Sequence, residues 1–274
     1  MISVIVPSKG CKYLKYPLLG LREQTTRPSE VVLVLKDCDV RYVEELCRQY
    51  GLPCVILEQR EGYFTYALNM GKREARGEIL VFTDDDTLPP PKWLEKCMRL
   101  HEAYRKVAGI SSRDIYLDLE TMRLLGTPDD RPAVRLYRWF IRPWLEPPHP
   151  VLKHYRLGVY ITRNANVAHG PYIPSQTCYS LPFRGVNMSF KSEYVYDVWF
   201  PEHPLLKRAP GNEQYFGLQL ILKGCSTIYV PHNPTLHIVR EESLSRTKRK
   251  SGIKVEVEIM KKLYIKLLKS LDSI

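Results

Sequence analysis

Three consecutive aspartates are the most informative group for chemistry in this sequence. Asp84, Asp85 and Asp86 come directly after ILVF (79–82), a short apolar run typical of a buried strand. Adjacent carboxylates repel one another, and a cation relieves that repulsion. Because ligands of open α/β sheets bind where strands end, the cluster predicts a site for Mg²⁺ or Mn²⁺ carrying a phosphate group. An acidic turn that caps the following helix is the alternative.

The elements that position this cluster can be read from the first 110 residues. Uninterrupted apolar runs, which alternate with helical patterns, lie at 2–6, 31–35, 54–57, 79–82 and 107–110. Runs of this kind are typical of strands buried on both faces, so we expect an α/β protein with a mainly parallel central sheet flanked by helices. Residues 1–110 would form its nucleotide-binding half, with helices near 64–75 and 92–106.

The following part of the chain differs in composition. Residues 111–182 are rich in proline, arginine and aromatic residues and lack regular periodicity, which predicts an irregular insertion packed over the carboxyl edge of the sheet. Residues 183–246, with a helix from Asn212 and a strand at 226–230, would complete a single domain of residues 1–246.

Residues 247–274 form a basic and then amphipathic tail. Ile259, Leu263, Leu267 and Leu271 make a narrow apolar stripe. We expect this helix to pack on the domain or at a homodimer contact. Contact with an anionic membrane surface is the alternative.

Composition excludes some classes of protein. Hydrophobic residues make up 44% and charged residues 26%, so extensive disorder is excluded. The net charge of +11 favours anionic ligands without choosing among them. The seven cysteines include no Cys-x-x-Cys pair and are expected mostly as buried thiols, with a disulfide among Cys38, Cys47 and Cys54 left open. No secretory leader or run of about 18 apolar residues is found, so a cytoplasmic location is expected, with peripheral contact at the inner membrane face as an alternative.

Several motifs together resemble inverting family 2 glycosyltransferases of the GT-A fold. In chain order they are SVIVPSKG, PSEVVLV, the series Gly62, Asn69, Gly71, Ala75 and Gly77, FTDDD, RGVNMSFKSE, GNEQYFGLQLILKG and VPHNPTLHI. Residues 2–100 and 183–240 are covered. The resemblance implies an enzyme that moves a sugar from a nucleotide-diphosphate donor to a hydroxyl of a glycan or lipid-linked acceptor.

The same resemblance implies roles for the polar residues. Asp84 would face the donor sugar and ribose, with Asp85 as the variable middle residue of the acidic motif, while Asp86 and His237 would bind the metal ion. Glu213 stands where the family has its catalytic aspartate and would accept a proton from the acceptor. A first-turn glutamate that merely interacts favourably with the helix dipole is the alternative.

Further positions are implied for donor binding. Pro7 and Ser8 would lie beneath the nucleotide base, with Gly62 and Asn69 nearby. The family's Asp-Asp-Gly-Ser motif is replaced by LKDCD, where Asp37 would read the base. Asn187 would line the sugar pocket, although a turn asparagine bound to its own backbone is equally consistent. Arg240 and Arg246 would hold the diphosphate or else be surface charge.

Two other functions remain open from the sequence. A nucleotidyltransferase also combines an α/β sheet with acidic metal ligands, but the Gly-rich basic loop expected after its first strand is missing. A nucleic-acid-binding protein would fit the net charge and the basic, aromatic 131–160 region, but no recognition motif supports it, so no nucleic-acid partner is expected.

Overall fold

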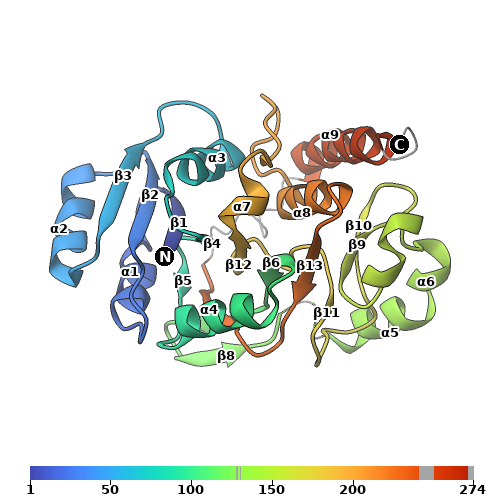
Figure 1. Cartoon of the computed structure of the whole chain (residues 1–274), viewed down its shortest axis with the longest axis horizontal. Coiled ribbons are helices and arrows are strands. Elements are labelled where there is room, and N and C mark those ends of the chain that lie inside the picture. The colour runs from blue at the N-terminus through green and yellow to red at the C-terminus, as the bar shows by residue number, and fades with distance from the viewer. Residues whose placement is uncertain (128, 130, 241–249, 271–274) are drawn as a thin grey trace.

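An eight-stranded sheet forms the centre of the molecule and carries helices on both faces (Figure 1). The computed structural model describes residues 1–127, 129, 131–240 and 250–270. The strand order is β11-β13-β6-β12-β4-β1-β2-β3. These strands are β1 (Ile2–Lys9), β2 (Glu30–Lys36), β3 (Cys54–Glu58), β4 (Ile79–Phe82), β6 (Val107–Ser111), β11 (Cys178–Tyr179), β12 (Met188–Lys191) and β13 (Ser226–Tyr229).

The N-terminal half forms as the apolar runs indicate. All residues of β1 except Lys9 are buried, and β1 pairs in parallel with both β2 and β4. Strand β3 extends the parallel set beyond β2. The α/β class and the mainly parallel sheet are therefore confirmed. Two strands depart from the pattern. Strand β12 lies antiparallel between β4 and β6 and joins the two parts of the sheet, and β11 lies antiparallel to β13 at one edge.

Two sets of helices cover the sheet. Helices α1 (Lys15–Arg22), α2 (Val40–Tyr50) and α4 (Trp93–Ala103) pack on one face through residues such as Leu18, Val43 and Trp93. Helices α3 (Phe64–Glu74), α7 (Ser192–Val195) and α8 (Asn212–Leu222) pack on the other, where Phe82 and Phe216 belong to one buried cluster. The two layers hold the strand ends rigidly at a common edge.

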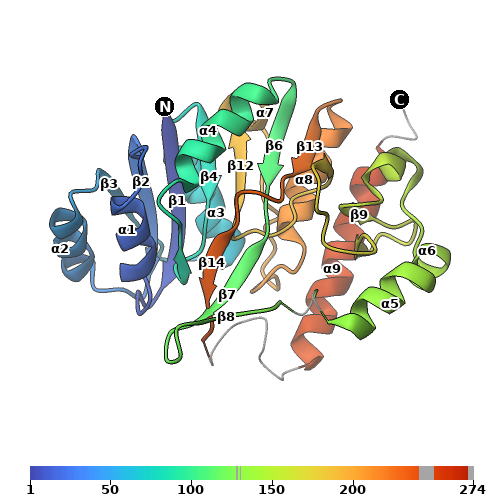
Figure 2. The same ribbon diagram turned by 90° about the horizontal axis from the view of Figure 1, so that it is seen from below.

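A smaller sheet lies at that edge, below the carboxyl end of β1 in Figure 2. Its order is β5-β14-β7-β8, with β5 (Thr87–Leu88), β7 (Asp114–Asp118), β8 (Arg123–Leu125) and β14 (Thr235–Ile238). Strand β14 pairs with both β5 and β7. This pairing brings three distant parts of the chain to one place.

The region expected as an irregular insertion contains more regular structure than its sequence indicates. Besides β7 and β8 it forms α5 (Pro132–Phe140), α6 (Arg142–Leu145), the 3₁₀ helix η2 (Pro150–Tyr155), β9 (Val159–Ile161), β10 (Val167–His169) and β11 (Cys178–Tyr179). Strand β11 even joins the main sheet beside β13. Most of these elements span two to six residues, too few for a periodicity to be visible in the sequence.

The C-terminal helix α9 (Lys250–Lys269) packs on the domain, as expected. Met260, Tyr264 and Leu268 are buried against residues of α8 and β9, and the expected stripe residues Ile259, Leu263 and Leu267 are partly buried beside them. Leu271 and the proposed domain boundary at 246/247 lie outside the described residues, so the division into 1–246 and 247–274 stays a prediction. In the described part of the chain, no helix is long and apolar enough to cross a membrane.

Two disulfides correct the expectation that most cysteines are thiols. Cys11 pairs with Cys38, and Cys47 pairs with Cys54. The second bond links the end of α2 to the start of β3, within the region where a disulfide was left open. Cysteine types and spacing alone do not determine pairing, because it depends on which loops meet in space.

Candidate active site

The acidic triplet lies in the turn between β4 and β5, at the carboxyl edge of the main sheet. Asp85 and Asp86 are buried and Asp84 is half-buried. The turn is fixed by the Thr87 hydroxyl, which donates to the Asp84 carbonyl at 2.9 Å, and by the Ile238 amide, which donates to the Asp86 carbonyl. Three acidic side chains are thus held together away from bulk water.

His237 on β14 meets this turn because β14 pairs with β5. Its Nε2 lies 3.3 Å from Asp86 Oδ1, and its Nδ1 lies 2.8 Å from Asp114 Oδ2 on β7. Burial lowers the pKa of His237, but the hydrogen bond to Asp114 and the charge of Asp86 raise it to about 10. Without a metal ion, the imidazolium form therefore bridges the two carboxylates.

The residues present fit a divalent metal ion. Asp84, Asp86 and His237 can each offer one ligand atom, and these atoms lie within 4.8 Å of one another. Asp86 Oδ1 is buried, and its contact with His237 Nε2 is a long one of 3.3 Å, so this oxygen has no hydrogen bond of good geometry from the described residues. Asp114 holds the other nitrogen of the His237 ring, which is the usual way in which a metal-binding histidine is oriented. Carboxylate oxygens with one imidazole suit Mn²⁺ and, with water and phosphate oxygens added, Mg²⁺.

The protonation of the aspartates supports the same interpretation. Burial, followed by the charge of Asp86, raises the pKa of Asp84 to about 7. Burial also raises the pKa of Asp85 to about 6, although a hydrogen bond from Ser8 opposes the shift. Such carboxyl groups are costly to ionise in an apoprotein, and a divalent cation would reverse both shifts.

Arg240 supplies the positive charge nearest to the triplet. Its Nε lies 2.7 Å from Asp86 Oδ2, and its Nη1 lies 3.5 Å from Asp85 Oδ1. The guanidinium group is therefore within reach of a phosphate beside the aspartates, while being held by them in this structure. Its role toward a diphosphate stays a prediction, and Arg246 lies outside the described residues.

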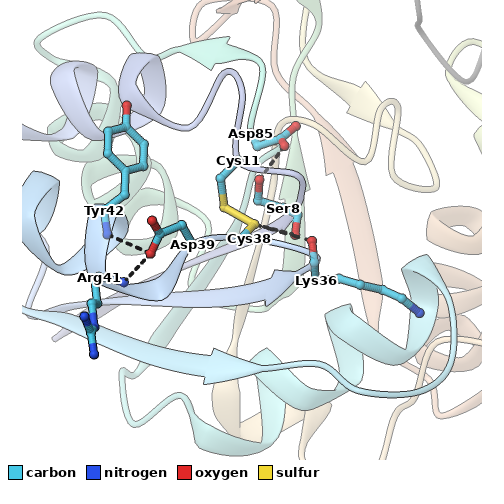
Figure 3. Close-up of a disulfide and its surroundings, with 8 residues drawn as sticks. All are labelled: Ser8, Cys11, Lys36, Cys38, Asp39, Arg41, Tyr42 and Asp85. Atoms are coloured by element: carbon cyan, nitrogen blue, oxygen red, sulfur yellow. Dashed lines mark hydrogen bonds between the residues drawn. A yellow bond between two sulfur atoms is a disulfide. The ribbon is translucent and has the colours of Figure 1, made fainter.

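The end of β1 connects the triplet to the loops after β1 and β2 (Figure 3). The Ser8 hydroxyl donates to Asp85 Oδ2 at 2.6 Å, and Pro7 lies in the same strand, opposite Val34. The Cys11–Cys38 disulfide joins the two loops next to Ser8. Asp37, the residue before Cys38, has a left-handed backbone conformation. Its exposed carboxylate lies 3.7 Å from Lys9 Nζ.

Three predicted donor-binding residues have other partners in the structure. Asn69 accepts from the Phe200 amide and donates to the Phe200 carbonyl and to Glu202. Asn187 accepts from Trp93 Nε1 and donates to two backbone carbonyls. Gly62 accepts from Lys36 Nζ at 2.6 Å.

The two asparagine side chains cross-link elements, and their hydrogen-bonding groups are taken by protein atoms. Their roles toward the donor stay predictions that these contacts do not support.

Glu213 lies in the first turn of α8. Burial raises the pKa of its carboxyl group, against the opposing effects of Arg184 and of the Gly185 amide, which donates to it. The turn is fixed by Gly211, whose φ of +86° suits glycine, and a Cβ there would lie only 2.6 Å from the Tyr264 hydroxyl. A half-buried carboxylate with a raised pKa suits a general base.

Arg184 connects Glu213 with the histidine. Its guanidinium group interacts with Glu213, lies 3.6 Å from Asp114 Oδ1 and forms an ion pair with Asp129. Asp129 in turn holds Arg138 of α5 at 2.5 Å. Charges therefore alternate from Asp86 through His237, Asp114, Arg184 and Asp129 to Arg138.

A family model decides the classification. The model described as Glycosyl transferase family 2 matches residues 3–152, which is more than half of the chain. The chain belongs to glycosyl transferase family 2.

Solved structures show the same GT-A fold for this family 2 chain. S. aureus TarS matches with a TM-score of 0.56 at 17% identity, covering 87% of this chain and 36% of TarS. GalNAc-T7, solved with UDP, GalNAc and Mn²⁺, matches with a TM-score of 0.66 at 13% identity, covering 88% of this chain and 44% of that one.

A sequence relative is also found. An uncharacterized glycosyltransferase of Haemophilus influenzae is 32% identical over 105 residues, which are 37% of this chain and 35% of the relative. The family 2 chain thus matches only about a third of the length of this relative and of TarS.

Two acidic residues of the site were missed in the sequence. Asp114 follows the buried run of β6, so the rule that selected Asp84 to Asp86 also applies to it. Asp129 lies in the proline-rich region and carries no comparable signal. Only the folded structure places it against Arg184.

Proposed function

We propose that this chain is an inverting glycosyltransferase that moves a sugar from a nucleotide-diphosphate donor to an acceptor hydroxyl. The observation that carries the proposal is the arrangement of Asp84, Asp86 and His237 at the carboxyl edge of the sheet, with Glu213 linked to it through Arg184. Membership of family 2 supports glycosyl transfer over nucleotidyl transfer.

Each residue has a chemical task in this proposal. Asp86 and His237 would hold the divalent ion, and Asp84, which the resemblance assigns to the donor sugar and ribose, lies close enough to be a third ligand. The ion would neutralise charge on the departing nucleoside diphosphate. Glu213 would accept the proton of the acceptor hydroxyl as its oxygen attacks the anomeric carbon, so the bond to the diphosphate breaks in the same displacement. Arg184 would keep Glu213 in place and in its charged form.

The neighbouring structures suggest which donor to test first. S. aureus TarS has been solved with UDP-GlcNAc and GalNAc-T7 with UDP, GalNAc and Mn²⁺. We therefore take uridine diphosphate sugars, with Mn²⁺ as the cation, as the first candidates. A glycan or lipid-linked acceptor, a homodimer and a cytoplasmic location are further proposals from the sequence.

The substitution Asp86→Ala tests the metal site. Because Asp86 would bind the ion directly, we expect loss of nucleoside diphosphate release from the sugar donor, by at least 100-fold, with a cooperative thermal transition retained. Asp118→Asn, on the exposed end of β7, serves as the control. Full activity of the Asp86→Ala protein, or of the wild type in excess chelator, would exclude the metal-dependent mechanism.

A further inference from the structure

Helices α5 and α6 carry a surface that the proposed function does not use. They lie at the end of the molecule opposite α2 in both Figure 1 and Figure 2. Neither helix has a single buried residue. Trp139 and Trp144 are 67% and 86% exposed, and the other exposed large apolar residues are Leu136, Tyr137, Phe140 and Leu145 in these helices and Ile141 between them. Single exposed apolar residues are ordinary in proteins, but such a concentration marks an interaction surface.

The orientation of α5 explains why this face points outward. Arg138 is turned toward the domain, where it pairs with Asp129 and is only 10% exposed. Leu136, Trp139 and Phe140 stand at i, i+3 and i+4, so they share a neighbouring face of the helix. The Trp139 and Phe140 rings stack with their centroids 5.6 Å apart. The ion pair therefore fixes the helix with its aromatic side toward solvent.

The charge of the region indicates the partner. Residues 131–182 contain seven lysines and arginines and a single acidic residue, Glu146. Glu146 is paired with Arg142, while Arg131 and Arg135 are exposed beside the aromatic face. Tryptophan, aliphatic side chains and arginine on one exposed surface are the combination that binds at the boundary of headgroups and acyl chains in anionic membranes.

The apolar surface continues toward the site. Strand β8 follows the same lower side of the molecule as α5 in both views and exposes Leu124 and Leu125. It pairs with β7, the strand that begins with Asp114. A bilayer lying against α5, α6 and β8 would therefore come within one strand of the residues that hold His237.

We propose that α5, α6 and the adjoining edge of β8 form a docking surface for an anionic lipid bilayer. The side chains that insert are Trp139, Phe140 and Trp144, and Arg131 and Arg135 bind the headgroups. The aliphatic residues Leu136 and Leu145 favour this partner over a glycan, because sugars offer hydroxyl groups and no hydrocarbon layer. The apolar stripe of α9 is packed against the domain, so α9 is not the part of the chain that we expect to contact a membrane. The surface of α5, α6 and β8 takes that role in the proposal.

Co-sedimentation of the full chain with vesicles tests the proposal without any sugar donor, so its result does not depend on the proposed activity. Vesicles of phosphatidylcholine with phosphatidylglycerol are compared with phosphatidylcholine alone. We expect binding to the anionic vesicles and at least a tenfold weaker affinity for Trp139→Ser/Trp144→Ser, since each inserted ring removes apolar surface from water. Tyr196→Ser, at a 74% exposed aromatic residue directly after α7, is the matched control and should bind like the wild type.

A second variant separates the role of charge. Arg131→Gln/Arg135→Gln should weaken binding to anionic vesicles by roughly tenfold or more, leave binding to neutral vesicles unchanged, and reduce the effect of added salt. This variant also decides the question if the tryptophan variant loses its cooperative thermal transition.

Three results would overturn the proposal. These are absence of wild-type binding to anionic vesicles, unchanged binding by both variants, and a wild-type dimer in solution that the tryptophan variant converts to monomer. The last would make a second copy of the chain the occupant of the surface.

Discussion

Asp114 offers a sharp test of how the site holds a metal ion. Its carboxylate is 4% exposed and lies 2.8 Å from His237 Nδ1, so the other nitrogen of the ring is directed at Asp86. In Asp114→Asn the side chain keeps its size and loses its charge. Removal of such an orienting partner weakens metal binding about 10- to 100-fold, or about 1.4–2.7 kcal/mol.

The choice of pH matters for this measurement. The pKa of His237 is raised to about 10, so the ring is protonated at neutral pH and must lose its proton before it can bind a metal ion. Wild-type affinity should therefore rise from pH 7 to pH 9. The substitution lowers this pKa and so weakens proton competition, which partly hides the loss at pH 7. At pH 9 proton competition in the wild type has fallen from about 1000-fold to about tenfold, so much more of the loss should appear than at pH 7.

Calorimetric titration of Mg²⁺ with UDP present, at pH 7 and pH 9, measures both effects. Asp118→Asn on the same strand is the control, because the Asp118 carboxylate is bound by the backbone amides of Glu120 and Thr121 and by the Thr121 side chain, away from His237. If Asp114→Asn bound Mg²⁺ about tenfold more tightly than the wild type at pH 9, as relief of proton competition alone predicts, the orienting role would be refuted. Wild-type affinity independent of pH would show that His237 does not bind the ion.

The remaining predictions concern the base, the helix that supports it and the disulfide beside the nucleotide loops. Glu213→Gln should lower kcat by about 10²–10⁴-fold with little change in donor affinity. The wild-type rate should fall as the pH drops below the raised pKa of Glu213. A variant with the wild-type rate and pH profile would contradict the role of Glu213 as the general base. Tyr264→Phe removes the 2.5 Å hydrogen bond to the Gly211 carbonyl, so it should lower the free energy of unfolding measured in urea by about 1–2 kcal/mol. It should also lower kcat more than it changes KM, and an unchanged kcat would mean that α9 contributes to stability alone. Cys11→Ser/Cys38→Ser removes a cross-link between residues 27 positions apart, and chain entropy predicts that the free energy of unfolding falls by about 3–4 kcal/mol. Unfolding at the same urea concentration as the wild type would show that the bond does not form in solution.

Much of the fold could be predicted because its signals are local. Val31 to Leu35 are all buried, so the run VVLVL shows directly in the sequence that β2 is covered on both faces. The position of Asp84 to Asp86 followed from the same pattern, since a buried strand must end at the edge of the sheet. The structure then brings Asp86 and His237 together through the pairing of β5 with β14, which joins residues 150 positions apart. The sequence of neither strand alone predicts this pairing.

The parts that could not be predicted depend on contacts between distant segments. Asn187 has the residue type of a sugar-binding side chain, and only the positions of Trp93 and Asn233 show that its amide is already satisfied. The exposed surface of α5 was equally invisible, because an amphipathic pattern shows which residues share a face and does not show whether that face is covered.

The place of β12 in the sheet has a consequence for synthesis of the protein. Strands β4 and β6 leave the ribosome early, but the strand that lies between them comes from residues 188–191. Until then the β4-β1-β2-β3 part of the sheet has an unpaired edge at β4, and β6 has neither of its partners, so both are open to pairing with wrong strands. The two parts of the sheet therefore cannot join until residue 191 has been made, and α8 with its glutamate cannot reach the metal-site edge until residue 222 has been made.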